Sequence, residues 1–311
     1  MKRRIGYALL AGVLLLLLGL TVNKVVGDAR YLDGYEAEMP LNAIASPLES
    51  MEDGYRRMEA VFMSQPGDLV PTVITLPETG EGPFPCVVFL HGIGQRKDFL
   101  DEITLPFNEA GFAMASFDQY MRGARSLSRE ASVFEEIGAF RDRAARTIID
   151  TRRLVDYLET REEIDSERIY LVGASYGAIT GATAAAFEPR YKATVLVYGG
   201  GGIGKLLNAP AIRNEIGPLV YLARPLAWYL MSKVDPLHYA GDIAPRPVLI
   251  QNGDHDQLIS NASAYALQEA CGEPKDIIWY ESDHVGLDEA QTQQVLDDAL
   301  DWLLEHDAGH R

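Results

Sequence analysis

The pentapeptide Gly173-Ala174-Ser175-Tyr176-Gly177 constrains the fold more than any other feature of this sequence. It follows a short apolar run over residues 169–172 and precedes an alanine-rich segment over residues 178–187. The two glycines allow a sharp turn from strand to helix, with strained backbone at the serine and its hydroxyl clear of the sheet. The helix start would direct free N–H groups and its dipole at that oxygen. The pattern therefore predicts a strand–turn–helix unit with Ser175 as a candidate nucleophile.

Strand-type and helix-type patterns alternate along most of the chain. Strand-type patterns separated by a hairpin signal predict strands at 57–63 and 69–76. Short apolar runs, typical of strands buried on both faces of a parallel sheet, predict further strands at 86–90, 112–117, 169–172, 193–198, 248–251 and 277–280. Helix-type segments lie between them, notably 98–110, 135–158, 178–187 and 288–304. The alternation predicts an α/β fold, with a doubly wound, mostly parallel sheet over residues 51–311.

One segment, residues 199–241, interrupts this alternation. It opens with four glycines and contains the apolar stretch 219–231, which is too short and too interrupted to span a bilayer. We expect a small helical cap inserted in the sheet fold. Its larger apolar side chains are candidates for lining a substrate pocket and favour an apolar acyl group: Tyr221, Leu226, Trp228 and Tyr229.

The N-terminus combines three basic residues, Lys2, Arg3 and Arg4, with an uncharged stretch over residues 5–22. As a helix this stretch would be about 27 Å long, enough for a hydrocarbon core. We expect residues 1–23 to be a single-pass membrane anchor with the catalytic domain on the extracytoplasmic side, or a signal segment that is cleaved so that the protein is secreted. Residues 24–50 are rich in turn formers and are expected to be a tether.

Charge and cysteine content exclude several functional classes. Asp and Glu number 45 against 28 Lys and Arg, a formal net charge of −17, which would repel nucleic acid. The two cysteines, Cys86 and Cys271, can form neither a disulfide framework nor a cysteine-rich metal site. No motif implies a metal or a cofactor, and the sequence gives no signal for an oligomeric state.

Two further strand ends supply the partners that a nucleophilic serine needs. The strand at 248–251 ends in the acidic turn Gly253-Asp254-His255-Asp256, and the strand at 277–280 is followed by Asp283-His284. A histidine base oriented by a carboxylate would activate Ser175, with either Asp254 or Asp256 as the acid. Another histidine, His91, follows the strand at 86–90, where the strand end would hold it rigidly and favours a structural role. The glycines around it would turn the N–H of Ile93 toward the serine, so we expect Ile93 and Tyr176 to form an oxyanion hole.

These motifs together make the chain similar to the α/β-hydrolase superfamily, most of all to its carboxylesterase and dienelactone-hydrolase-like branches. The resemblance runs from about residue 57 to 304 and is carried by the GASYG turn, the HGIG turn at 91–94 and the segments 235–237 and 243–250. It implies the acid at the end of Gly-x-x-Asp, which is Asp256, and the triad order Ser175, Asp256, His284. The dienelactone hydrolases themselves use a cysteine nucleophile where this chain has Ser175.

We therefore expect a serine hydrolase that cleaves small-molecule carboxylic esters through an acyl-enzyme intermediate. The same machinery would also serve a peptidase, a thioesterase or an acyltransferase. A non-catalytic, membrane-tethered binding module on the same scaffold is the alternative outside enzymology. An intact serine, acid and base favour catalysis, because binding alone requires none of the three.

Overall fold

The computed structural model describes residues 2–308, apart from the side chains at 2–6, 8–10, 13, 16, 133, 134, 222, 223 and 308. The chain forms two compact units, divided between Gly34 and Tyr35. The first contains helix α1 (Lys2–Ala29), in which Lys24 Nζ and Asp28 Oδ2 form an ion pair of 2.8 Å across one helical turn. The second contains the sheet and all the remaining elements.

Helix α1 includes the segment 5–22 that we expected to cross a membrane. In the part of the chain that the structure describes, no helix is both long enough and apolar enough to do so. The side chains of residues 5, 6, 8–10, 13 and 16 lie outside that description. The expected membrane-spanning helix therefore has no support from the structure.

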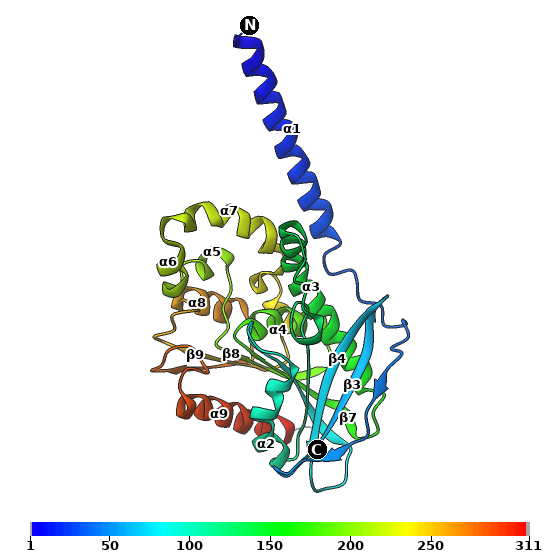
Figure 1. The fold of residues 1–311 in the computed structure, drawn as a ribbon. Helices are drawn as coiled ribbons and strands as arrows, with labels where there is room; N and C mark the ends of the chain where they lie inside the picture. Colours follow the sequence, from blue (N-terminus) through cyan, green and yellow to red (C-terminus); the bar gives the residue numbers. More distant parts are fainter. Residues whose placement is uncertain (1, 309–311) are drawn as a thin grey trace. The chain divides into compact units, whose positions relative to one another are not determined.

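The second unit is built on one mixed, mostly parallel sheet (Figure 1). Its strand order is β1-β3-β4-β6-β5-β7-β8-β9-β10, with β2 also pairing with β3. Strands β5 to β10 pair in parallel, whereas β4 lies antiparallel to β6 and to β3. The strands are β1 (Ile44–Ala45), β2 (Glu49–Ser50), β3 (Tyr55–Gln65), β4 (Asp68–Pro77), β5 (Phe84–Leu90), β6 (Ala113–Phe117), β7 (Ile164–Ala174), β8 (Tyr191–Val197), β9 (Val248–Gly253) and β10 (Lys275–Tyr280). All eight predicted strands are present as β3 to β10, and the doubly wound α/β prediction is confirmed.

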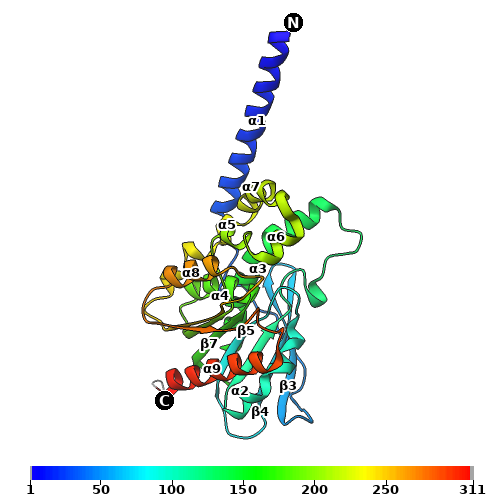
Figure 2. The same ribbon diagram turned by 90° about the vertical axis from the view of Figure 1, so that its left-hand side faces the viewer.

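Helices cover both faces of this sheet, so the central strands are buried on both sides. In Figure 1, α2 (Leu100–Glu109) and α9 (Glu289–Ala308) lie on one side, and α4 (Tyr176–Phe187) and α8 (Asn261–Ala270) on the other. In the view of Figure 2, turned by 90°, α9 and α2 again lie next to each other on the same side of the sheet. Strand β5 is buried along its whole length, and its side chains alternate between two apolar cores. Cys86, Val88 and Leu90 face the core of α4, while Val87 and Phe89 face that of α2 and α9.

The long helix α3 (Val133–Leu158) begins at a capping box. The Ser132 hydroxyl accepts from the Glu135 N–H at 3.3 Å, and the Glu135 carboxylate accepts from the Ser132 N–H at 2.7 Å. The two bonds satisfy N–H groups that a helix start leaves without intrahelical partners. The helix begins two residues before the predicted start at 135 and ends at the predicted residue, Leu158.

The interruption between β8 and β9 is helical, as predicted. It contains α5 (Ile203–Leu206), α6 (Pro210–Ile216), α7 (Val220–Met231) and the short 3₁₀ helices η3 (Gly217–Leu219), η4 (Ser232–Val234), η5 (Pro236–His238) and η6 (Ala240–Ile243). The carboxylate of Asp235 joins its two ends, because it accepts from the N–H groups of Gly202 at 2.9 Å and Leu237 at 3.2 Å. We call residues 199–241 the insertion.

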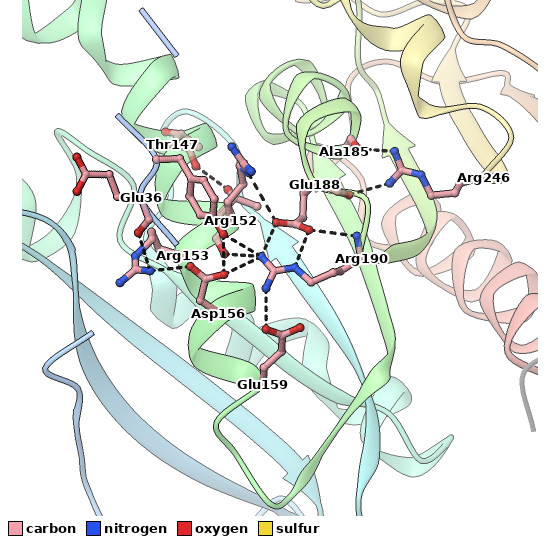
Figure 3. Close-up of polar contacts among 12 residues, drawn as sticks. Glu36, Thr147, Arg152, Arg153, Asp156, Glu159, Ala185, Glu188, Arg190 and Arg246 are labelled. Atoms are coloured by element: carbon pink, nitrogen blue, oxygen red, sulfur yellow. Dashed lines mark hydrogen bonds and ion pairs between the residues drawn. The ribbon is translucent and has the colours of Figure 1, made fainter. Parts of the chain in front are cut away.

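The lead-in to the sheet is anchored by charged side chains of α3 (Figure 3). Arg153 is fully buried, and its guanidinium donates to the carbonyls of Glu36 at 3.2 Å and Met39 at 2.6 Å, and to Asp156 at 2.7 Å. The guanidinium carbon of Arg152 lies 3.5 Å from the ring centroid of Tyr35. The expected tether over 24–50 is thus divided: its first residues end α1, and those from Tyr35 onward belong to the sheet unit.

Candidate active site

Ser175 lies at the sharp turn between β7 and α4. Its backbone has φ +56° and ψ −116°, a strained conformation for a residue with a side chain, at a cost of about 1–3 kcal/mol. The flanking glycines are required by close packing. A Cβ on Gly177 would lie 1.8 Å from the carbonyl oxygen of Leu90, and one on Gly173 would lie 2.3 Å from that of Gly177. The Ser175 N–H donates to the carbonyl of Val197 at 2.8 Å, which ties the turn to the neighbouring strand.

The structure brings Ser175, His284 and Asp256 together from three separate strand ends. Ser175 Oγ lies 2.8 Å from His284 Nε2, and His284 Nδ1 lies 2.7 Å from Asp256 Oδ2. With the imidazole proton on Nδ1, His284 donates to Asp256 and accepts from the serine hydroxyl. Both His284 and Asp256 are buried. The three side chains that the sequence singled out therefore lie within hydrogen-bond distance of one another.

The choice between Asp254 and Asp256 is visible in their surroundings. Asp256 Oδ1 accepts from the N–H groups of Leu258 at 2.7 Å and Ile259 at 2.8 Å, which leaves Oδ2 for the imidazole. The Asp254 side chain is 43% exposed, and its charged neighbour is His255, at 3.4 Å. Asp256, not Asp254, faces His284.

Two residues that we did not single out hold His284 in place. Asp283 Oδ1 accepts from the N–H of His284 at 2.7 Å and from that of Gln257 at 2.9 Å, so it joins the loops that carry His284 and Asp256. The Tyr198 ring meets the imidazole edge to face, with centroids 5.7 Å apart. Asp283 directly precedes His284 in sequence, but only the pairing of β9 with β10 brings Gln257 within its reach.

Two hydrogen bonds fix the peptide that joins Gly92 to Ile93, in the turn after β5. His91 Nδ1 donates to the carbonyl of Gly92 at 2.8 Å, and the Gln95 N–H donates to the same carbonyl at 3.2 Å. Because C=O and N–H point in opposite directions across a trans peptide, these bonds also orient the Ile93 N–H. His91 is fully buried, and burial lowers its pKa. Its role in the structure is to hold this turn.

The second expected N–H donor, Tyr176, is the first residue of α4. A helix start has no intrahelical acceptor for this N–H, so it is free to bind an anion. The tyrosine side chain lies under Arg143 of α3, whose guanidinium carbon is 4.4 Å from the ring centroid. Burial raises the pKa of the Tyr176 hydroxyl to about 12, and burial lowers the pKa of Arg143.

A cavity of about 220 Å³ opens beside Ser175 and His284. Its walls are largely apolar and come from β5, α2, α9 and the loops between them. They include Phe89, Phe99, Ile103, Leu258, Val285, Val295 and Leu296. The walls are contributed from both ends of the chain, because α2 and α9 lie together on one side of the sheet.

The four side chains predicted to line the pocket do not line this cavity. Tyr221, Leu226 and Trp228 are more than half exposed on α7, at 66%, 55% and 58%. Trp228 borders a separate depression within the insertion, beside Arg224. Tyr229 lies under Arg141, with the guanidinium carbon 5.9 Å from the ring centroid. Among the described residues, this cavity is lined by α2 and α9 rather than by these four side chains, so their part in binding a substrate stays a prediction.

Among the side chains that the structure describes, no group of three or more His, Cys, Asp or Glu residues is placed so that it could hold a metal ion. The two cysteines are buried and unpaired. Burial raises the pKa of the Cys86 thiol, and it raises that of Cys271 to about 11. Neither thiol lines the cavity beside Ser175.

Known proteins similar to this chain are hydrolases. The putative hydrolase YtaP of Bacillus subtilis (strain 168) is 24% identical over 248 residues, 74% of this chain and 79% of that protein. The 2,6-dihydropseudooxynicotine hydrolase of Paenarthrobacter nicotinovorans is 26% identical over 285 residues, 83% of this chain and 66% of that protein. Among solved structures, acetyl xylan esterase 1 from a Thermoanaerobacterium species has the same fold. Its TM-score is 0.69 at 18% identity, covering 91% of this chain and 93% of that one.

The family assignment follows from the extent of a further match. The sequence pattern of the dienelactone hydrolase family covers residues 70–303, which include the turn at Ser175 and both loops that carry Asp256 and His284. The match spans most of the chain and all of the parallel strands. The chain therefore belongs to the dienelactone hydrolase family, within the α/β-hydrolase superfamily, and is a hydrolase.

Proposed function

We propose that this protein hydrolyses carboxylic esters with Ser175 as the nucleophile, His284 as the general base and Asp256 as the orienting acid. The observation that carries the proposal is the continuous chain of hydrogen bonds from Ser175 Oγ through the imidazole to Asp256, at 2.8 and 2.7 Å. A serine hydroxyl becomes a useful nucleophile only when a base takes its proton, and this base has a partner that fixes its tautomer.

The reaction proceeds in two steps that use the same residues. Ser175 Oγ attacks the ester carbonyl as its proton passes to His284 Nε2, and the imidazolium then gives that proton to the departing alcohol. Water enters, loses a proton to His284 and attacks the acyl-serine, which releases the acid and restores the serine. The Asp256 carboxylate stabilises the imidazolium in both steps.

The oxygen that becomes negative in each tetrahedral intermediate is stabilised by the N–H groups of Ile93 and Tyr176. Preorganised donors of this kind commonly contribute a factor of about 10²–10³ each to the rate. Tyr176 supplies its N–H at the positive end of α4, so the helix dipole acts in the same direction.

The apolar cavity beside Ser175 receives the acyl group of the substrate. Its volume of about 220 Å³ and its apolar walls favour a short acyl chain over a long one. Butyrate and hexanoate esters are therefore expected to be better substrates than palmitate.

The test is hydrolysis of p-nitrophenyl esters from acetate to palmitate by the full chain and by Ser175→Ala. We expect turnover that peaks between butyrate and hexanoate and is lost in the variant. Thioesters and peptide amides assayed in parallel separate the other activities open to the same triad. A folded wild-type protein that hydrolyses none of the esters would refute the proposal.

We further propose that the domain works on the extracytoplasmic side of the membrane, either tethered or after cleavage of its N-terminal segment. The support is the sequence of three basic residues followed by the uncharged stretch 5–22. An alkaline phosphatase fused after Gly34 would be active if the segment exports the chain. N-terminal sequencing of the mature protein then shows whether the segment is retained, and an inactive fusion would refute export.

A further inference from the structure

Arg143 is a buried cation for which the described residues provide no counter-charge. Only 2% of its surface is exposed, and none of the ion pairs formed by the described residues includes it. Its Nε is buried and finds no acceptor in the described part of the chain. A buried charge without a carboxylate is costly, so the position requires an explanation other than stability.

The contacts of Arg143 join the two halves of the proposed oxyanion hole. Its Nη2 donates to the carbonyl of Ile93 at 3.3 Å, and its guanidinium lies over the ring of Tyr176 at 4.4 Å. Ile93 follows β5 and Tyr176 begins α4, so one side chain of α3 contacts both residues whose N–H groups would bind the oxyanion. Arg122 donates through its Nε to the same Ile93 carbonyl.

We propose that Arg143 is a positioning residue that fixes Ile93 and Tyr176 relative to each other, and that its unpaired charge favours the oxyanion. This inference rests on the proposed ester hydrolysis. His91 and Gln95 hold the Gly92 carbonyl on the N-terminal side of Ile93, and Arg143 and Arg122 hold the carbonyl on its C-terminal side. A guanidinium can do both tasks because its planar face stacks on a ring while its edge donates hydrogen bonds.

The primary variant is Arg143→Met, which keeps the length of the side chain and removes its charge and donors. We expect kcat per active site on p-nitrophenyl butyrate to fall by about 10- to 100-fold, less than for a deleted oxyanion donor, while KM changes little. Active sites are counted by titration with a p-nitrophenyl phosphonate. The inhibition constant of a trifluoromethyl ketone, which forms a tetrahedral oxyanion on Ser175, should rise by the same factor as kcat falls.

Two further variants separate positioning from general stability. Arg143→Lys keeps a charge that can lie over the Tyr176 ring and should recover most of kcat. Arg146→Met, one turn along α3, removes an arginine that contacts Asp68 and Tyr120 instead and should leave kcat per active site unchanged. If Arg143→Met does not fold, Arg143→Gln takes its place, and the proposal then requires Gln to lose kcat where Lys retains it.

Clear results would overturn the proposal. The proposal is overturned if Arg143→Met keeps the wild-type kcat per titrated site, or if the inhibition constant of the ketone is unchanged in that variant. It is also overturned if Arg146→Met loses as much kcat as Arg143→Met. If Arg143→Met has fewer titratable active sites but a normal kcat at the sites that remain, Arg143 has only a structural role. A wild-type protein that neither turns over esters nor reacts with the phosphonate would instead refute the proposed function itself.

Discussion

The carboxylate of Asp256 is held so that only one of its oxygens can face His284. Oδ1 already accepts from two backbone N–H groups, those of Leu258 and Ile259. In Asp256→Asn the amide oxygen must take that place, which turns the NH₂ group toward Nδ1. The imidazole would then have to move its proton to Nε2, the atom that must accept from Ser175.

Asp256→Asn is therefore expected to lower kcat by about 10³- to 10⁴-fold with little change in KM. Asp254→Asn is the matched control, because its partly exposed side chain should leave kcat within about twofold. Steady-state kinetics of both variants on p-nitrophenyl butyrate measure the difference. Equal losses in the two variants would mean that the acid has been misassigned.

The reactivity of the two cysteines tests whether the nucleophile is the Ser175 hydroxyl or a thiol. A thiol reacts as the thiolate, and the pKa of Cys271, raised to about 11 by burial, keeps it protonated at pH 8. The pKa of Cys86 is also raised by burial. Thiolate would form only as the pH rises toward these values, so neither cysteine should react in the folded protein at pH 8.

We expect iodoacetamide at pH 8 to leave the activity intact, and Ellman's reagent to detect two thiols only after guanidinium unfolds the chain. A cysteine that acted as the nucleophile would be alkylated and inactivated under the same conditions. Rapid inactivation with one modified cysteine would argue against Ser175 as the nucleophile.

At the scale of elements, much of the fold and the proximity of Ser175, Asp256 and His284 could be predicted, because both depend on local patterns. Strand β5 is a short, wholly apolar run and β8 is a mostly apolar one, and the carboxyl ends of parallel strands meet at one edge of a sheet. That rule alone brings Ser175, Asp256 and His284 near one another. The walls of the cavity were not predictable in this way, since they depend on which helices pack together.

The insertion illustrates what local sequence patterns cannot predict, namely which side chains line a cavity. Its aromatic residues suggested a pocket, but an apolar helix segment does not specify which face meets the substrate site. The described lining of the cavity beside Ser175 includes α2 and α9, which lie far apart in the chain and meet because both cover one face of the sheet. Arg143 was likewise not identified, because its position in α3 becomes meaningful only beside Ile93 and Tyr176.

The packing of α9 against the cavity leads to a prediction about chain length. Val295 is fully buried and forms part of the cavity wall. Val295→Phe should fill part of the space and shift the preferred ester toward acetate, whereas Val295→Ala should enlarge it and shift the preference toward longer chains. The ratio of kcat/KM for hexanoate to that for acetate should therefore change in opposite directions, by about 10-fold or more each way.

The control for both variants is kcat/KM on p-nitrophenyl acetate, which should stay near the wild-type value because the relay is not altered. If both variants shift the chain-length preference in the same direction, the cavity beside Ser175 does not bind the acyl group.

At the scale of the whole molecule, one buried arginine makes several of the contacts that hold the lead-in of the sheet unit. Arg153 donates to the carbonyls of Glu36, Ala37 and Met39, the first of which is labelled in Figure 3. The Glu36 carbonyl also accepts from the Met39 N–H at 3.2 Å. Asp156, its ion-pair partner, is also bound by Arg190 at 2.7 Å. Removal of Arg153 therefore leaves Asp156 paired and acts mainly on the lead-in.

We expect Arg153→Met to lower the free energy of unfolding by about 2–3 kcal/mol, because several charge-assisted hydrogen bonds are lost together. In a domain of this size that corresponds to a fall in Tm of about 3–5 °C. Arg161→Met is the control, since the partly exposed pair of Arg161 with Glu163 should contribute less than about 1 kcal/mol.

Limited proteolysis distinguishes local detachment from general loosening of the fold. In Arg153→Met the segment over residues 35–43 should become cleavable while the sheet resists, because the strands keep both cores and only the lead-in loses its anchor. Activity on p-nitrophenyl butyrate should persist below the lowered Tm, since neither Arg153 nor the lead-in lines the cavity beside Ser175. A normal Tm with no new cleavage site would show that the carbonyls of residues 36–39 are held by the rest of the lead-in. Cleavage throughout the sheet would mean that Arg153 supports the whole core.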